Sequence, residues 1–224
     1  ARSSYFGLID LAGFKKDRFY LYQSRWRPDH AMAHILPHWN WPDRLGEVTP
    51  VHVFTSGDEA ELFLNGKSLG RKQKGEYEYR LRWDDVVYEP GTLKVVAYKN
   101  GKKWAEEIVK TTREVEKIEL KADRSTIKGD GKDLAFVTVR ITDVDGLTVP
   151  TANNHVTFEL EGPGEIVATD NGDPTDMNAF GSHSRNVFNG LALVIIKGNK
   201  EEGALRLKVK CNGLKSDAIT IKTE

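Results

Sequence analysis

The chain has 224 residues, of which 39% are hydrophobic and 29% are charged. Its 33 basic and 33 acidic side chains leave no net charge, which argues against a nucleic-acid or membrane-surface ligand. No run of about 18 apolar residues is present, and the N-terminus ARSSYFGLID lacks the basic-then-apolar order of a signal peptide. Because the first residue is alanine, we expect a processed or truncated product.

One helix is predicted near the N-terminus. The segment FKKDRFYLYQSRW places Phe19, Tyr22 and Trp26 at positions i, i+3 and i+7, which is the spacing of one helical face. Pro28 disfavours helical geometry in the residue before it. We therefore expect the helix to end close to Trp26.

The region from residue 33 to residue 110 alternates between apolar and polar side chains, as strands with one buried face do. The Asn65-Gly66 pair predicts a type I′ hairpin. About seven short strands separated by turn signals are typical of an immunoglobulin-like sandwich, here over residues 28–112. In YEYRLRWD the inward face is predicted to carry Tyr77, Tyr79, Leu81 and Trp83. Further strands are predicted at 51–55, 92–99 and 103–109.

A charged bridge, TTREVEK, separates this first set of strands from a second set. The second set is predicted in LAFVTVRITD, HVTFEL, EIVATD, LALVIIK, ALRLKVKC and AITIK. Together these strands predict another immunoglobulin- or invasin-like sandwich over residues 113–224, so the fold class is all-β. Phe136 and Phe158 are expected in its core. The single cysteine, Cys211, follows the apolar side of its strand and is predicted to be a core thiol.

The segment HILPHWNW allows three interpretations. A metal site is disfavoured because Pro37 breaks a helix there, and on a strand His34 and His38 would lie roughly 13 Å apart. Trp39 and Trp41 would share the opposite face, where they could stack on sugar rings or pack in a core or between domains. We favour packing and keep sugar binding by these two tryptophans as the alternative.

Acidic residues suggest two further sites. Glu59 and Glu61 have the separation of a glycosidase pair, but nothing nearby desolvates either of them, so a solvated face is expected. The TDNGDPTD loop offers oxygen ligands for calcium, although Asn-Gly and Asp-Pro also form ordinary turns. The candidate ligands are Asp170, Asn171, Asp173 and Asp176. No nucleophile motif, P-loop or dinucleotide fingerprint is present, and we predict no catalytic residue and no cofactor.

Several long segments together resemble the C-terminal part of glycoside hydrolase family 2 enzymes, with β-galactosidases of polysaccharide-degrading bacteria as the nearest match. They are SSYFGLIDLAGFKKDRFYLYQSRW, HILPHWNW, VHVFTSGDEAELFLNGKSLG and LRWDDVVYEPGTLKVVAYKNGKKWA. The later ADRSTIKGDGKDLAFVTV, GPGEIVATDNGDPTD and FNGLALVII resemble an additional sandwich of the same enzymes. The resemblance spans nearly the whole chain.

The resemblance implies a parent enzyme that hydrolyses a β-galactoside with retention, on a (β/α)₈ barrel. Residues 1–27 resemble the tail of that barrel, and the family's catalytic glutamates lie upstream of Ala1. The resemblance thus implies a non-catalytic fragment whose partner is its own upstream barrel, in a periplasmic or secreted protein. No nucleic acid or membrane partner is expected, and self-association is expected through residues 5–26.

The alternative is a carbohydrate-binding or cell-surface adhesion module, because ITDVDGLTVP and DNGDPTD also resemble bacterial surface repeats. A sugar-binding sandwich should expose at least two coplanar aromatic rings. The second predicted sandwich has no tryptophan or tyrosine, which weakens this interpretation for residues 113–224.

Overall fold

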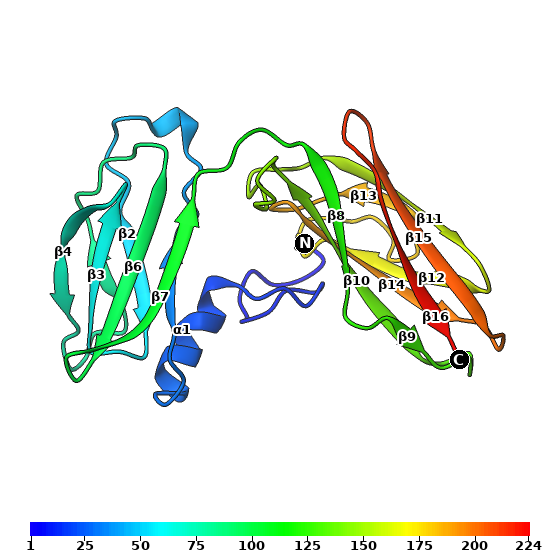
Figure 1. Ribbon diagram of the computed structural model, residues 1–224, viewed down its shortest axis with the longest axis horizontal. Coiled ribbons are helices and arrows are strands. Elements are labelled where there is room, and N and C mark those ends of the chain that lie inside the picture. Colours follow the sequence, from blue (N-terminus) through cyan, green and yellow to red (C-terminus); the bar gives the residue numbers. More distant parts are fainter. The chain divides into compact units, whose positions relative to one another are not determined.

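A computed structural model describes all residues from Ala1 to Glu224 (Figure 1). The chain divides into two compact units. The N-terminal unit consists of residues 15–112 together with residues 7–9. The C-terminal unit consists of residues 113–224 together with residues 1–6 and 10–14. The two predicted sets of strands therefore fall into different units, and the first 27 residues contribute to both.

The N-terminal unit contains one helix and seven strands, in two antiparallel sheets ordered β1-β2-β5 and β4-β3-β6-β7 (Figure 1). The elements are α1 (Asp17–Trp26), β1 (Ala33–Leu36), η1 (Pro42–Arg44), β2 (Val51–Thr55), β3 (Glu59–Leu64), β4 (Lys67–Gln73), β5 (Leu81–Trp83), β6 (Thr92–Lys99) and β7 (Lys102–Lys110). The strands predicted at 51–55 and 92–99 coincide with β2 and β6.

The core of this unit lies between its two sheets. On β3 burial alternates residue by residue, so that Leu62 is buried and its strand neighbours are partly exposed. Val53 of β2 and Val95 of β6 belong to the same buried cluster, as does Trp83, which was expected there. Because both sheets contribute to one apolar core, the unit is a β-sandwich.

The predicted helix and the predicted hairpin are confirmed. Helix α1 has Asp17 in its first turn and Arg25 in its last, charges that complement the helix dipole. It lies against β1 and β2. Asn65 and Gly66 have φ values of 50° and 82°, the positive pair that a type I′ turn requires.

Two strand predictions in this unit were wrong in extent. Tyr77 and Tyr79 precede β5 and are 88% and 48% exposed. Only Leu81–Trp83 pairs with a neighbouring strand, because the pairing of β2 with β5 is limited to Val51–Val53. The strand geometry considered for HILPHWNW also extends too far, because β1 stops at Leu36, where the following proline has no N–H to donate to the sheet. Alternation in sequence does not reveal how far a partner strand extends.

The C-terminal unit has nine strands in two sheets, ordered β12-β14-β10-β8 and β13-β11-β15-β16-β9. They are β8 (Lys117–Ala122), β9 (Thr126–Ile127), β10 (Leu134–Thr142), β11 (His155–Glu161), β12 (Gly164–Asp170), β13 (Ser184–Asn186), β14 (Leu191–Gly198), β15 (Gly203–Cys211) and β16 (Asp217–Thr223). All pairs are antiparallel except β16 with β9. The sequence analysis missed β8, β9 and β13, which are short or strongly charged.

Residues from both sheets again share one core, so this unit is also a β-sandwich. Phe158 is buried there as predicted, but Phe136 is 38% exposed, and that prediction was wrong. On β10 the buried face is formed by Ala135, Val137 and the alternate residues after them, which turns Phe136 outward. Cys211 is only partly buried, at the edge of the core.

Candidate functional site

The outer face of helix α1 carries aromatic side chains that the N-terminal unit leaves exposed or half-buried. It consists of Phe19, Tyr22 and Trp26, and we call it the α1 outer face. Tyr22 is 40% and Trp26 is 69% exposed, and their rings meet edge to face at 4.8 Å. The ammonium of Lys15 lies 4.5 Å from the centre of the Phe19 ring. The helical spacing read from the sequence therefore marks a face that points away from the unit's own core.

The opposite side of α1 faces the sandwich. Ser24 is buried, and its hydroxyl donates to the carbonyl of Leu21 at 2.7 Å. Tyr20, which is half-buried, stacks on the ring of His34 at 3.8 Å between ring centres. The helix thus faces the sandwich with Ser24 and the Tyr20 ring, while Tyr22 and Trp26 stay on the outside.

His34 of β1 holds α1 to the sandwich through two carboxylates. Its Nε2 lies 2.9 Å from Oδ1 of Asp17, in the first turn of α1, and its Nδ1 lies 3.3 Å from Oε1 of Glu107 on β7. The other oxygen of Glu107 accepts the backbone N–H of Ile35. We call these three ionisable residues, His34, Asp17 and Glu107, the His34 clamp.

The His34 clamp favours the charged imidazolium. Burial alone would lower the pKa of His34, but the hydrogen bonds to Asp17 and Glu107 outweigh it and raise the pKa from 6.5 to about 9. The same surroundings act on Tyr20, whose pKa is raised by burial and by the two carboxylates. At neutral pH the ring therefore donates from both nitrogens and bridges helix to strand.

We expect this clamp to make the stability of the N-terminal unit depend on pH. Because the pKa of His34 is higher in the folded state, its contribution is complete below about pH 6.5 and is lost as pH rises through about 9. The size is on the order of 3 kcal/mol. Urea unfolding followed by tryptophan fluorescence between pH 6 and 10 should show this loss. The His34→Gln variant should lack it, and parallel pH profiles for the two proteins would contradict the clamp.

Trp39 belongs to the core. Its side chain is fully buried, its Nε1 donates to the carbonyl of Glu89 at 3.0 Å, and its ring lies 5.0 Å from that of Tyr88. Its own carbonyl accepts the hydroxyl of Thr111 at 2.6 Å. The packing interpretation of HILPHWNW accounts for this residue, since a sugar ring has no access to it.

Trp41 lies nearer the surface but is also covered. Its indole stacks on His38 at 4.4 Å and donates to the His38 carbonyl at 2.7 Å. Burial lowers the pKa of His38, so the two histidines of the segment have opposite charge preferences. His34 is on β1 and His38 follows its end, so they do not share a strand face as the sequence analysis assumed. Sugar binding by Trp41 stays an untested prediction.

The TDNGDPTD loop is held by its own hydrogen bonds. Asp170 accepts the N–H of Gly172 at 2.7 Å, Asn171 accepts that of Asp173 at 2.9 Å, and Asp173 accepts both donors of Thr175. These are the turn contacts that Asx residues form in loops. No group of three or more His, Cys, Asp or Glu side chains is arranged to hold a metal ion.

Asp176, the last of the candidate ligands, has a different role. Its Oδ2 accepts from Nη1 of Arg185 at 2.6 Å, and the Arg185 side chain is completely buried. The rest of this guanidinium donates to Thr169 Oγ1 and to the carbonyl of Ala179. The sequence analysis missed Arg185, because an arginine between two polar residues carries no burial signal.

The paired glutamates of β3 form surface contacts. Glu59 forms an ion pair with Arg71, and Glu61 accepts the hydroxyl of Ser68 at 2.6 Å. Neither is fully buried. Their arrangement fits the expected solvated face.

No helix of the chain is long and apolar enough to cross a membrane.

Comparisons with known proteins match both units. Residues 118–220 match the family model described as glycoside hydrolase family 2 C-terminal domain 5, and residues 46–105 match a domain of unknown function, DUF4982. "Beta-galactosidase BoGH2A" of Bacteroides ovatus is 43% identical over 224 residues, which cover 100% of this chain and 26% of that protein. A "putative beta-glucuronidase" of Formosa agariphila is 38% identical over 76% of this chain and 16% of its own length.

Solved structures of glycosidases are also similar to this chain. A beta-glycosidase from Bacteroides vulgatus has a TM-score of 0.91 at 33% identity, covering 97% of this chain and 28% of that chain. A glycosyl hydrolase family 2 member from Bacteroides cellulosilyticus has a TM-score of 0.92 at 31% identity, covering 97% and 32%. The fold and these matches define a β-sandwich region of a glycosidase. The chain belongs to glycoside hydrolase family 2 and corresponds to its C-terminal region, as the sequence resemblance implied. It spans about a quarter of the length of the Bacteroides ovatus relative.

Proposed function

We propose that this chain is the non-catalytic C-terminal region of a β-galactosidase-like enzyme and that it supports the catalytic barrel of the same protein. In this proposal residues 1–27 are the tail of the barrel, and two immunoglobulin-like sandwiches, residues 28–112 and 113–224, follow it. The β-galactosidase relative at 43% identity supports the choice of parent. The parent would hydrolyse a β-galactoside with retention, in the periplasm or outside the cell, and the sandwiches would buttress the barrel and line the edge of the substrate cleft.

The observation that carries the proposal is the α1 outer face. A helix in a finished sandwich would be expected to turn its large aromatic residues inward, yet Tyr22 and Trp26 are exposed and the helix is attached by the His34 clamp. Exposed apolar surface of this kind marks an interaction site. A helix that packs against a barrel on one side and against a sandwich on the other would have one aromatic side and one side attached to the sandwich.

The non-catalytic part of the proposal is tested by an assay. We expect the purified chain to hydrolyse aryl β-galactosides no faster than a mock preparation from the same host. The reason is that the strands of this chain form two sandwiches and no (β/α)₈ barrel, and the glycosidase-like pair Glu59 and Glu61 lies on the surface of β3. Turnover above the mock preparation, lost when the chain is removed by immunodepletion, would contradict the proposal.

The supporting part is tested on the α1 outer face. In the isolated chain this face lacks its proposed partner, so we expect mass measured by light scattering to rise with concentration. The variant Tyr22→Ser/Trp26→Ser should abolish most of that rise. The matched control Tyr77→Ser/Met177→Ser removes two apolar side chains that are 88% and 70% exposed elsewhere, and it should behave like the unchanged chain.

The same two double variants can be compared in a longer protein that includes the catalytic region, where the α1 outer face would have its proposed partner. There we expect the α1 variant to lower the melting temperature by several degrees, because the aromatic residues would be buried against the barrel, while the control leaves it unchanged. Equal effects of the two variants in both settings would show that the α1 outer face has no particular partner.

A further inference from the structure

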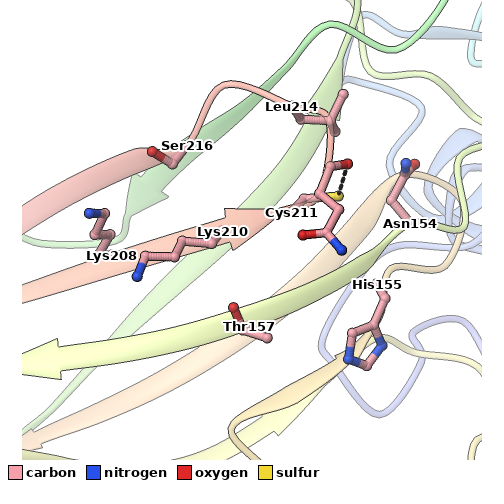
Figure 2. A pocket seen from close by; sticks show the side chains of 9 residues that line it. Asn154, His155, Thr157, Lys208, Lys210, Cys211, Leu214 and Ser216 are labelled. Atoms are coloured by element: carbon pink, nitrogen blue, oxygen red, sulfur yellow. Dashed lines mark hydrogen bonds between the residues drawn. The ribbon is translucent and has the colours of Figure 1, made fainter.

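The C-terminal unit has an open groove of about 530 Å³ on the outer side of the sheet that contains β11 and β15 (Figure 2). This volume is within the range of small-molecule sites. The lining is polar except for a partly buried sulfur and one leucine. It consists of Asn154, His155, Thr157, Lys208, Lys210, Cys211, Asn212, Leu214 and Ser216.

The groove follows from the pattern of the two strands. On β15 the residues Leu207 and Val209 are buried, so Lys208 and Lys210 stand on the outer side. Thr157 of β11 lies directly across from Lys210 in the antiparallel register. Because short side chains at 157 and 216 flank long lysines, the surface is hollow between them. The Asn212-Gly213 turn, with Gly213 at φ 78°, closes one end.

The charges of the groove favour an anion. Two ammonium groups line it, and no carboxylate does. Lys210 contacts Glu159 just outside the lining, at 2.6 Å, with both side chains about half exposed. Lys208 forms no ion pair of its own, although its charge helps Lys210 to lower the pKa of Glu159. An exposed ion pair of this kind contributes little and exchanges readily with an incoming anion.

The remaining groups are suited to hydroxyls. Thr157, Ser216, Asn154 and Asn212 can each donate and accept hydrogen bonds, which matches the alternating donors and acceptors of a sugar. The Cys211 thiol donates to the carbonyl of Asn212 at 3.6 Å, the dashed line in Figure 2. Burial raises its pKa, although a hydrogen bond with Asn154 acts in the other direction, so the thiol stays protonated and inert.

We propose that this groove binds a saccharide that carries an anionic group, a carboxylate or a sulfate. The anion lies between Lys208 and Lys210 and displaces Glu159, while the hydroxyls contact Thr157 and the asparagines. The groove has no Phe, Tyr or Trp ring, the side chains on which neutral sugars most often stack. This inference concerns the C-terminal unit alone and does not depend on the supporting role proposed for α1.

The test is a titration of the whole isotope-labelled chain, observed by the amide signals of residues 154–157 and 208–216. The probes are methyl β-D-glucuronide, methyl β-D-glucoside 6-sulfate, neutral methyl β-D-glucoside and sodium sulfate. We expect saturable shifts with the two acidic glycosides. Binding of the neutral glycoside should be at least about tenfold weaker, since it loses a charge-assisted contact.

Three variants locate the site. Lys208→Ala/Lys210→Ala should weaken binding of the acidic glycosides at least about tenfold. Glu159→Gln should strengthen it severalfold, because the competing carboxylate is gone. Lys222→Ala, an exposed lysine at the far end of neighbouring β16, should leave it unchanged. The proposal is overturned if the neutral glycoside binds equally well, if sodium sulfate alone saturates the same signals with equal affinity, if the double lysine variant binds normally, or if no signal saturates.

Discussion

Trp39→Ala is expected to lower the free energy of unfolding of the N-terminal unit by about 3–5 kcal/mol, the usual cost of truncating a large buried aromatic residue. The indole is fully buried among residues of both sheets. Its loss would leave a cavity and also the carbonyl of Glu89 without its donor. Because domains are stable by only about 5–15 kcal/mol, we expect partial unfolding at 37 °C.

Urea unfolding followed by tryptophan fluorescence measures this effect selectively. All five tryptophans lie between residues 26 and 104, within the N-terminal unit, so the signal reports on this unit alone. Trp26→Ala is the matched control, since the same substitution is made at a side chain that is 69% exposed. It should change the unfolding free energy by less than about 0.5 kcal/mol. Similar midpoints for the two variants would place Trp39 outside the core.

Asp176→Ala is expected to have an effect of similar size in the C-terminal unit, about 3–5 kcal/mol, because it strands the charge of Arg185. The arginine side chain is 0% exposed, and Asp176 is its only carboxylate partner within 4 Å. The neutral contacts to Thr169 and Ala179 do not balance a guanidinium charge. A buried cation without its anion is among the most costly defects in a folded protein.

Circular dichroism during urea unfolding is the appropriate measurement, because the C-terminal unit has no tryptophan. Glu159→Ala is the control, since it breaks the exposed Glu159–Lys210 pair of the same unit and should leave the midpoint unchanged. Titrations with calcium complete the experiment. If calcium stabilised the unchanged chain and not the Asp176→Ala variant, the calcium hypothesis for this loop would replace the ion-pair interpretation.

The two interpretations of the TDNGDPTD loop show why acidic clusters are hard to assign from sequence. Four Asp and Asn side chains within seven positions can form a calcium loop as well as a series of Asx turns, although the sequence lacks EF-hand spacing. What distinguishes them is whether the oxygens converge, and here Asp176 turns toward an arginine nine residues further on. Arg185 is buried because its own strand, β13, pairs with β11 and places the guanidinium against Thr169 and Asp176.

Local chemistry by itself determined much of the secondary structure. Strands such as β2 and β6 follow from approximate alternation and β-branched residues, the Asn65-Gly66 turn from its tolerance of positive φ, and α1 from its spacing and from Pro28. These features depend on neighbours in the chain and on backbone sterics. The family, too, was recognisable from long segments, and the comparisons confirm it.

The tertiary structure alone decided which faces of these elements are covered. The sequence determined that α1 has an aromatic face, but only the packing of Tyr20 on His34 directs Tyr22 and Trp26 outward. It determined that β15 carries lysines, but only the register with Thr157 makes a groove beside them. The physical reason is that burial and pairing depend on the partner element, and the partner is chosen by the whole fold rather than by the residues of the segment itself.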